Sequence, residues 1–235
     1  MKLDNATVLV TGANRGIGLA FAREALARGA RKVYAGARNP ANVTLAGVEP
    51  IRLDVTRPDD VAAAAQRCAD VTLLINNAGI ASVGGFLAEG SVESARQQLE
   101  TNFFGPLRLS QAFAPVLAAN GGGAIVNVLS IASWINRPLL GIYGATKSAA
   151  WALTNSLRHE LHAQGTQVLA MHVGFVDTDL TRGLDFPKSS PEVIVRRTLD
   201  ALEAGAQEVL ADDMTRQVKQ GLSAEPGVYL LAPAA

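Results

Sequence analysis

The sequence predicts an α/β protein built on one doubly wound parallel sheet. Short runs of Val, Ile and Leu alternate with helical stretches along the chain, and a glycine-rich turn joins the first run to the first helix. Strands buried on both faces of a parallel sheet are typically continuous apolar runs, and the helices between them cover the faces. The 235 residues are enough for one such domain with a large core. We therefore expect a single domain over residues 1–235, without linkers or repeats.

Each element follows from its local pattern. Strands are expected at 7–11, 32–37, 51–55, 71–75, 124–128 and 166–172, with a short last strand at 208–210. Helices are expected at 19–28, from 58 onward, at 91–118, at 143–162 and from 191 onward. Gly29 ends the first helix, and Gly105-Pro106 interrupts the third.

Composition excludes several classes of function. The 21 basic and 21 acidic residues balance, so no basic excess indicates binding to nucleic acid or an anionic membrane. The single cysteine, Cys68, permits no internal disulfide and fits a reducing compartment. No signal-peptide pattern and no apolar run of transmembrane length is present. We expect a cytoplasmic protein without membrane contact.

The segment Thr11-Gly12-Ala13-Asn14-Arg15-Gly16-Ile17-Gly18 follows the first strand and opens the first helix. Glycines at such a turn let the backbone approach a pyrophosphate, which the positive helix N-terminus attracts. The spacing is Gly-x3-Gly-x-Gly. The alternative is a turn that is rich in glycine for packing alone, but its position between strand and helix favours nucleotide binding.

Tyr143 and Lys147 lie four residues apart at the start of a predicted helix, so their side chains share one face. A nearby ammonium favours the phenolate and should lower the tyrosine pKa. The tyrosine hydroxyl would then be usable as a proton donor or acceptor near neutral pH. The alternative is a partly buried ring beside a solvated amine.

With both motifs in hand, the chain resembles the short-chain dehydrogenase/reductase family over residues 5 to about 185. The turn at 11–18 and Tyr143-x3-Lys147 are similar to that family's cofactor and catalytic motifs. Asn76-Asn77-Ala78-Gly79 is similar to its Asn-Asn-Ala-Gly motif. Ser130 lies thirteen residues before Tyr143, the family's usual separation, whereas the competing Ser133 lies only ten before it.

The resemblance implies a Rossmann-type fold and an oxidoreductase that interconverts alcohols and carbonyls with NAD(P). The implied catalytic residues are Asn102, Ser130, Tyr143 and Lys147. Tyr143 would transfer the proton, and Lys147 would lower the pKa of Tyr143 and bind the nicotinamide ribose. Ser130 would hold the substrate oxygen, and Asn102 would hold a water that relays protons. Taken singly, Ser130 could instead cap a loop and Asn102 could mark a helix kink. The implied cofactor contacts are Gly12, Asn14, Arg15, Gly16, Ile17, Gly18, Arg38, Asp54, Val55, Asn76, Ala78, Gly79, Tyr143, Lys147, Gly174, Val176 and Thr178.

The sequence departs from the family in two places. Val173-Gly174 follows the sixth strand where the family usually has Pro-Gly, which can reshape the turn beneath the nicotinamide. The C-terminal part lacks the glycine-rich last strand of many members, which puts in doubt a tetramer interface built there. The resemblance implies a homodimer through the helices of Asn102 and Tyr143, with a tetramer as the alternative.

The end of the second strand bears on the choice of cofactor. NAD-binding relatives have an acid there for the ribose hydroxyls, but this chain has Ala37. Arg38 follows, and Arg15 lies in the nearby turn; guanidinium groups suit a 2′-phosphate. We expect NADP(H), with NAD(H) as the alternative if both arginines are merely solvated. Asp54 would accept from the adenine amino group, unless it only caps a turn.

The predicted substrate pocket is apolar. Its candidate lining residues follow the fourth, fifth and sixth strands: Val83, Phe86, Ile131, Trp134, Ile135, Leu139, Leu140, Phe175, Leu180, Leu184 and Phe186. No cation that would hold an acid is apparent, so we expect a small hydrophobic ketone, aldehyde or alcohol as substrate. A short substrate lid is expected at 179–190.

Three alternatives are weaker. His159 and His162 lie three apart on a helix, but no third ligand accompanies them, so no metal site is expected. A catalytically silent NAD(P)-binding regulatory or scaffold protein would typically lack the tyrosine or lysine that this chain retains. A nucleotide-sugar epimerase of the extended type would need a further C-terminal domain.

Overall fold

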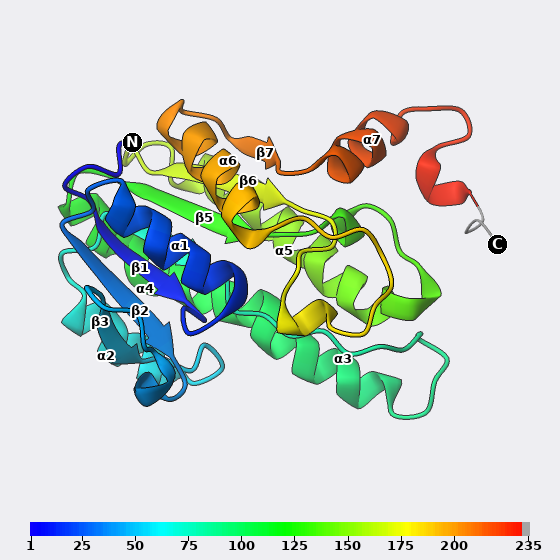
Figure 1. Ribbon diagram of the computed structural model, residues 1–235, viewed down its shortest axis with the longest axis horizontal. Coiled ribbons are helices and arrows are strands. Elements are labelled where there is room, and N and C mark those ends of the chain that lie inside the picture. The colour runs from blue at the N-terminus through cyan, green and yellow to red at the C-terminus, as the bar shows by residue number, and fades with distance from the viewer. Residues whose placement is uncertain (232–235) are drawn as a thin grey trace.

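The computed structural model describes residues 1–231 and confirms the predicted class (Figure 1). One parallel sheet has the strand order β3-β2-β1-β4-β5-β6-β7. The strands are β1 (Thr7–Thr11), β2 (Lys32–Ala37), β3 (Glu49–Arg52), β4 (Leu73–Asn76), β5 (Ala124–Val128), β6 (Gln167–His172) and β7 (Glu208–Leu210). The order reverses between β1 and β4, and ligands of doubly wound sheets bind outside the carboxyl ends of the strands at such a point.

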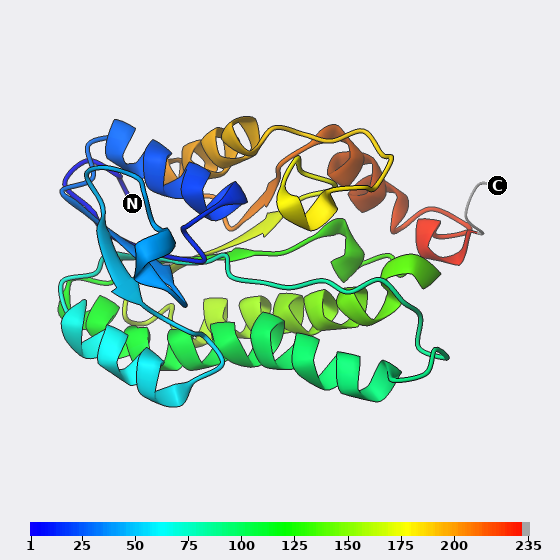
Figure 2. The same cartoon turned by 60° about the horizontal axis from the view of Figure 1, so that its bottom comes forward.

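Helices cover both faces of the sheet (Figure 2). One layer contains α1 (Gly16–Ala27) and α6 (Pro191–Glu203); the other contains α2 (Pro58–Arg67), α4 (Gly105–Ala119) and α5 (Gly141–Glu160), with α3 (Ser91–Leu99) continuing the line of α4. The last helix, α7 (Asp213–Gly221), follows β7. Single turns occur at Pro40–Asn42, Ile131–Ser133, Pro138–Leu140, Asp179–Thr181 and Val228–Leu230. Within residues 1–231, no helix has the length and apolar character needed to cross a membrane.

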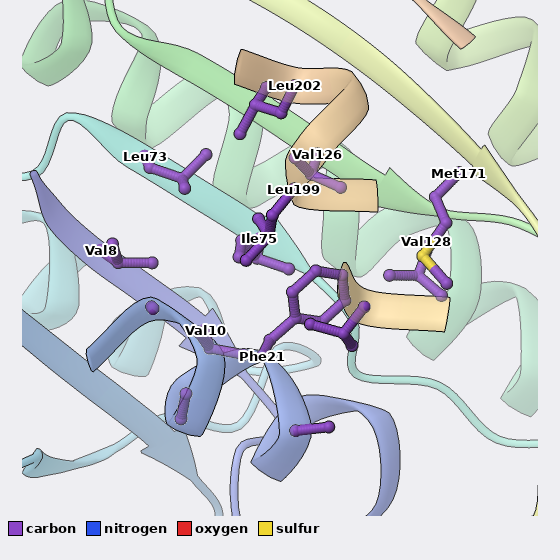
Figure 3. Packing of buried hydrophobic residues seen from close by; sticks show 14 of the residues in the cluster. Val8, Val10, Phe21, Leu73, Ile75, Val126, Val128, Met171, Leu199 and Leu202 are labelled. Atoms are coloured by element: carbon purple, nitrogen blue, oxygen red, sulfur yellow. The ribbon is translucent and has the colours of Figure 1, made fainter. Parts of the chain in front are cut away.

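Alternate side chains of each strand enter two hydrophobic cores, one on each face of the sheet. On one face, side chains of β1, β4 and β5 pack against Phe21 of α1 and Leu199 and Leu202 of α6 (Figure 3). On the other face, Leu9 and Leu74 pack with Phe113 of α4 and others. Both faces are buried because the strands are apolar throughout, as the sequence predicts.

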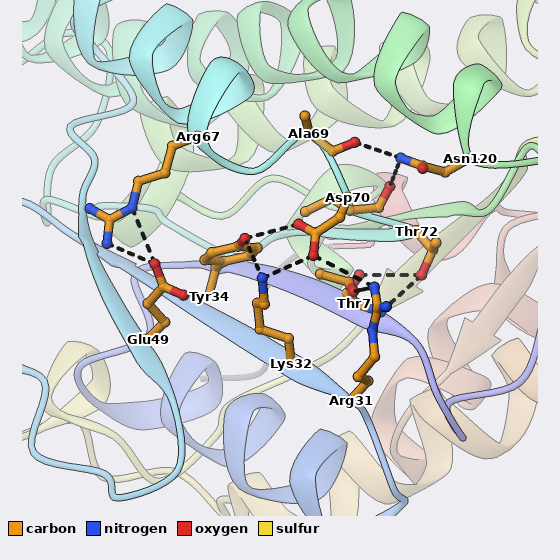
Figure 4. Close-up of polar contacts among 11 residues, drawn as sticks. Thr7, Arg31, Lys32, Tyr34, Glu49, Arg67, Ala69, Asp70, Thr72 and Asn120 are labelled. Carbon is orange, nitrogen blue, oxygen red and sulfur yellow. Dashed lines mark hydrogen bonds and ion pairs between the residues drawn. The ribbon is translucent and has the colours of Figure 1, made fainter.

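Polar side chains close the amino-terminal edge of the sheet (Figure 4). The hydroxyl of Tyr34 donates to Asp70 at 2.9 Å, and the ammonium of Lys32 donates to the same carboxylate at 3.0 Å. Nearby, the guanidinium of Arg67 donates to Glu49 at 2.7 Å. These contacts fasten the starts of β2 and β3 to the end of α2, whereas the carboxyl-terminal edge carries the cavity described below.

Some boundaries differ from the predictions. The third strand is β3 at Glu49–Arg52 rather than 51–55; it is an edge strand, which tolerates Pro50 within it. The fourth begins at Leu73 rather than 71, and the helix of Tyr143 begins at Gly141. Helix α7 was not predicted, although Asp212 caps it by accepting from the backbone N–H of Thr215 at 2.7 Å.

The predicted interruption before Gly105-Pro106 is a π-helical turn over Glu100–Phe104. Pro106 has no N–H with which to donate to the carbonyl of Asn102 four residues earlier, so the regular ladder cannot continue there. Gly105 is also confined, since a Cβ on it would lie 2.9 Å from a methyl group of Val55. The turn therefore combines a missing donor with close packing.

We expect Phe21→Ala to lower the free energy of unfolding by about 3–5 kcal/mol, because it empties the centre of a fully buried cluster. Leu87→Ala is the control: that side chain is 102% exposed, so its loss should change stability by less than about 0.5 kcal/mol. Urea unfolding followed by circular dichroism measures both. A loss below about 1 kcal/mol for Phe21→Ala would contradict the assigned packing.

Candidate active site

One cavity of about 1580 Å³ lies along the carboxyl-terminal edge of the sheet, beyond the ends of β1, β2, β4, β5 and β6. Most of the predicted site residues line it, although they come from distant parts of the sequence. These are Gly12, Asn14, Arg15, Gly16, Ile17, Arg38, Asp54, Val55, Ala78, Gly79, Ser130, Tyr143, Lys147, Gly174, Val176 and Thr178. The exceptions among the predicted residues are Gly18, Asn76 and Asn102, which lie behind the wall.

The conformation of the glycine-rich turn requires glycine at three positions. Gly12 and Gly16 have φ of 65° and 55°, a region that side chains disfavour. Gly18 does not line the cavity; a Cβ there would lie 2.2 Å from the carbonyl oxygen of Gly12. Gly18 therefore lets α1 approach the turn, while the other two glycines leave a bare backbone at the start of a helix. This cradle fits the pyrophosphate of a dinucleotide.

Thr11 fastens this turn to β4, a role that was not predicted. Its hydroxyl accepts from the backbone N–H groups of Asn77 and Ala78 at 3.0 and 2.9 Å, and donates to the carbonyl of Ile75 at 3.3 Å. The side chain is 1% exposed. The ends of the two central strands are thus held together beneath the cavity.

Within the Asn76-Asn77 pair, the second residue reaches the cavity and the first does not. Asn76 is buried, and its amide donates to the side-chain oxygen of Asn127 at 2.8 Å. The amide of Asn77 donates to the carbonyl of Thr11 at 2.9 Å. The prediction of Asn76 as a cofactor contact is therefore corrected: it joins β4 to β5, because strand alternation turns it away from the cavity.

Asn102 is buried in the π-helical turn and organises the segment after β4. Its side-chain oxygen accepts from the N–H of Ile80 at 2.9 Å, and its amide donates to the carbonyl of Ile80 at 2.8 Å and to the hydroxyl of Thr146 at 3.0 Å. A Cβ on Gly79 would lie 3.3 Å from the Asn102 oxygen and 3.9 Å from the Lys147 ammonium. Asn102 and Lys147 therefore flank the same backbone segment.

Lys147 is 6% exposed, and its ammonium donates to the carbonyl of Val128, at the end of β5, at 2.7 Å. The ammonium lies 5.7 Å from the centre of the Tyr143 ring. Burial lowers the pKa of Lys147 to about 8. The lysine side chain thus ties α5 to the sheet and places a titrating group at the cavity.

The expected lowering of the Tyr143 pKa is wrong for this arrangement. Loss of water around the hydroxyl raises its pKa to about 12, and a hydrogen bond with Ser130 opposes this only in part. The ammonium of Lys147 bonds to the carbonyl of Val128, and the desolvation of the Tyr143 hydroxyl dominates. The tyrosine is therefore a neutral hydrogen-bond donor at neutral pH.

Ser130, rather than Ser133, lines the cavity, as predicted. Its hydroxyl accepts from the N–H of Ala132 at 3.1 Å. Behind it lies His172, which was not predicted: its Nδ1 is 3.3 Å from the Ser130 carbonyl oxygen, and its ring stacks on Trp134 with centres 3.9 Å apart. Burial lowers the pKa of His172 to about 3, so this imidazole is neutral at neutral pH.

The two predicted phosphate-binding arginines differ in their surroundings. Arg15 is paired with Asp179 across the cavity at 2.9 Å, and Arg182 contacts the same carboxylate. Arg38 lines the cavity beside Asp54. Burial acts to raise the Asp54 pKa, but hydrogen bonds from Thr56 and the charge of Arg38 lower it overall.

The substrate end of the cavity is mainly apolar. It includes the predicted Ile131, Ile135, Leu139, Leu140, Phe175, Leu180, Leu184 and Phe186, together with Ile80 and Met214, which were not predicted. Phe175 and Phe186 stack with ring centres 4.5 Å apart, so the segment after β6 folds back on itself. Three predicted lining residues lie elsewhere: Val83 and Phe86 are more than half exposed, and Trp134 packs behind Ser130.

Arg137 lines the cavity, although no cation was expected there; its guanidinium donates to the carbonyl of Leu231 at 2.7 Å. In the part of the chain that the structure describes, no group of three or more His, Cys, Asp or Glu side chains is placed to hold a metal ion.

The chain is similar to known proteins in sequence and in fold. The family model described as short chain dehydrogenase matches residues 6–187. The chain is 37% identical over 217 residues to Short-chain dehydrogenase ptmH of Penicillium ochrochloron, covering 88% of this chain and 79% of that protein. A short-chain dehydrogenase from Burkholderia cenocepacia J2315 in complex with NADP has a TM-score of 0.94 and 39% identity, covering 99% and 100% of the two chains. A gluconate 5-dehydrogenase from the same organism, in complex with NADP and tartrate, has a TM-score of 0.80 and 25% identity, covering 88% and 93%.

The buried lysine predicts a pH dependence of stability. Its pKa is about 8 in the folded protein, against the unperturbed 10.5. Between these values the unfolded chain binds more protons, so the free energy of unfolding should gain from this group as pH rises. Lys147→Met removes that gain. The variant should be more stable than the parent at about pH 7, and its advantage should shrink by about pH 9.5.

Urea unfolding of both proteins across this window measures the effect. Lys2→Met, which removes an exposed ammonium, is the control. The window stays below pH 10 because Tyr143, whose folded pKa is about 12, contributes its own dependence above the unperturbed value of 10.0. A stability difference that stays constant across the window would contradict a depressed lysine pKa.

Proposed function

Since the chain belongs to the short-chain dehydrogenase family of oxidoreductases, we propose that it interconverts an uncharged, hydrophobic ketone or aldehyde and its alcohol with NADP(H). The observation that carries this proposal is the convergence of Ser130, Tyr143 and Lys147 on one cavity whose far end is apolar. The dinucleotide would lie along Gly12 and Gly16, and its nicotinamide would supply or accept the hydride. The residues described below supply position, charge and a proton.

Tyr143 serves as the proton donor in the direction of reduction. With its pKa raised to about 12, its hydroxyl is protonated at neutral pH and can donate to a carbonyl oxygen. Ser130 lies within hydrogen-bonding reach of the same hydroxyl, so both groups can hold one substrate oxygen. Fixed donors around the atom that gains negative charge stabilise the transition state.

Lys147 places a second titrating group at the same cavity. With a pKa of about 8, its ammonium is largely protonated at neutral pH, yet it needs little energy to give up a proton. It would bind the ribose hydroxyls beside Tyr143. Its bond to the Val128 carbonyl fixes the side chain before any ligand arrives, so less conformational freedom is lost when the ligand binds.

Asn102 would act through its backbone in a proton relay. Both amide hydrogens are already donated, to Ile80 and Thr146, so the side chain is a poor donor to a relay water. The carbonyl of Asn102 lacks the regular helical donor, because Pro106 has no N–H. We propose that a water bound at this carbonyl connects Lys147 to solvent.

Arg38 would select NADP(H). Ala37 beside it brings no carboxylate to the place where NAD-specific relatives have one, and Arg38 lines the cavity. Arg15 would contribute only after leaving Asp179. The structure of the Burkholderia cenocepacia dehydrogenase with NADP supports this assignment by similarity.

The remaining assignments concern substrate and assembly. The stacked pair Phe175–Phe186 supports residues 179–190 as a lid over an apolar substrate. A hydroxy acid is the second candidate substrate, because the guanidinium of Arg137 at the cavity could bind its carboxylate. The similar gluconate 5-dehydrogenase in complex with tartrate supports this candidate. A homodimer through α4 and α5 is supported by Phe104 of the turn before α4, which is 40% exposed.

A catalytically silent nucleotide-binding protein is disfavoured because the tyrosine and lysine both face the cavity.

Tyr143→Phe should lower kcat by about 10²- to 10⁴-fold, because it removes only the proton-transferring hydroxyl. The dissociation constant for NADPH should stay within about threefold, since the ring and Lys147 remain. Tyr229→Phe, which alters a 55%-exposed tyrosine, is the control. The assay is a screen of hydrophobic ketones and aldehydes, with polyols and sugar acids as comparison, read at the nicotinamide absorbance.

Retention of a tenth or more of kcat by Tyr143→Phe would overturn the role of the tyrosine. Turnover of sugar acids alone would replace the substrate class. If the unmodified protein binds NADPH but turns over nothing in the screen, the catalytically silent alternative stands.

The unmodified protein should prefer NADPH to NADH by about 10- to 150-fold in kcat/KM, as one charge-assisted contact of about 1.5–3 kcal/mol would give. Added salt should erode the preference, because the site is open to solvent. Arg38→Asp should abolish or invert it. Asp179→Asn should increase it, because Arg15 is then released from its partner. Equal kcat/KM for both cofactors in the unmodified protein would sink this assignment.

A further inference from the structure

The turn after β6 is held by a residue from the far end of the chain. Asp212 follows β7, and its carboxylate accepts from the N–H of Gly174 at 2.7 Å. Asp212 is 6% exposed, and Gly174 lines the cavity. A buried carboxylate therefore binds the backbone of the candidate active site. Buried carboxylates are rare unless their oxygens are bonded.

Both ends of one peptide group are bonded in this way. The carbonyl of Val173 accepts from the N–H of Ile131 at 3.0 Å, while the N–H of the same peptide, on Gly174, donates to Asp212. Ile131 is the neighbour of Ser130. The peptide plane is thus fixed between the serine segment and the start of α7, although Val173 does not restrict its own φ as a proline would.

The second oxygen of Asp212 has a separate function. It accepts from the N–H and the hydroxyl of Thr215, both at 2.7 Å, and so caps α7. Met214, between the two residues, lines the cavity, and a Cβ on Gly174 would lie 3.4 Å from its sulfur. The first turn of α7 therefore forms part of the wall that Gly174 continues.

We propose that Asp212 is a positioning residue that orients the Val173–Gly174 peptide and thereby sets where the reacting end of the cofactor lies relative to Tyr143. This inference rests on the proposed oxidoreductase function. Holding that end within a fraction of an ångström matters because a displacement of about 1 Å can reduce a rate on the order of 100-fold. The adenine end of the cavity, near Arg38 and Asp54, does not contact Asp212, so cofactor affinity should change less than the chemical step.

Asp212→Ser separates the two functions of the carboxylate. Serine caps helices well and can still accept from the N–H of Thr215, but it is too short to reach Gly174. We expect kcat to fall about 10- to 100-fold, with the dissociation constant for NADPH within about threefold. The deuterium isotope effect on kcat with cofactor labelled at the transferred hydrogen should rise, because hydride transfer becomes slower relative to product release.

Thr215→Val is the matched control, because it removes a bond to the other oxygen of Asp212 and leaves the one to Gly174. It should keep kcat within about threefold of the parent. Asp212→Asn is the second variant if Asp212→Ser fails to fold; its amide loses one acceptor, and its kcat should fall in the same direction. Thermal unfolding of all variants separates loss of structure from loss of rate.

Two outcomes would overturn the proposal. One is a folded Asp212→Ser protein with kcat and isotope effect unchanged; the other is an equal loss in Thr215→Val, which would assign the effect to helix capping. Absence of turnover in the unmodified protein is a different result. It would refute the proposed function itself, and with it the positioning role of Asp212, which is defined for the chemical step.

Discussion

The hydroxyl of Thr11 is the constraint on which the site depends. Three hydrogen bonds from this one buried group join the end of β1 to the end of β4, where the direction of strand order reverses. Parallel strands alone bring their carboxyl ends to one edge, but they leave the turns beyond them free to move. With Thr11 bonded, the glycine turn and the Asn77–Gly79 segment are fixed together, and the cavity lies between them.

The fold was predictable because its signals are local and repeated. The continuous apolar runs of β1, β4 and β5 allow only strands buried on both faces, and the glycine turn identifies the first crossover. The errors lie where tertiary contacts override local pattern. β3 is displaced because pairing with β2, rather than its own apolar run, sets its limits. Helix α7 was missed because it is short and polar, and its cap, Asp212, becomes informative only when Gly174 is beside it.

The site was predictable from motif spacing, but its energetics were not. Spacing identified Ser130, Tyr143 and Lys147, which meet at the cavity. It could not show that the lysine ammonium bonds to Val128, nor that desolvation of the Tyr143 hydroxyl raises the pKa of this tyrosine. Spacing also could not show which of Asn76 and Asn77 lines the cavity. The place where β4 ends decides this: Asn76 is its last residue and Asn77 is the first residue beyond it. His172 carries no motif signal, and the bonds that Thr11 makes could not be predicted from the motif that it begins, because each residue acts through a partner more than 40 residues away in sequence.

The burial of Cys68 has a practical consequence. Its side chain is 0% exposed, and burial raises the thiol pKa to about 12. A thiolate is the reactive form of cysteine, so the native residue is inert toward alkylating reagents while the protein is folded. A cysteine introduced on the surface would then be the one reactive thiol of the folded chain. Fluorescent or spin labels could be attached at a chosen point of the segment after β6 without first removing the native residue.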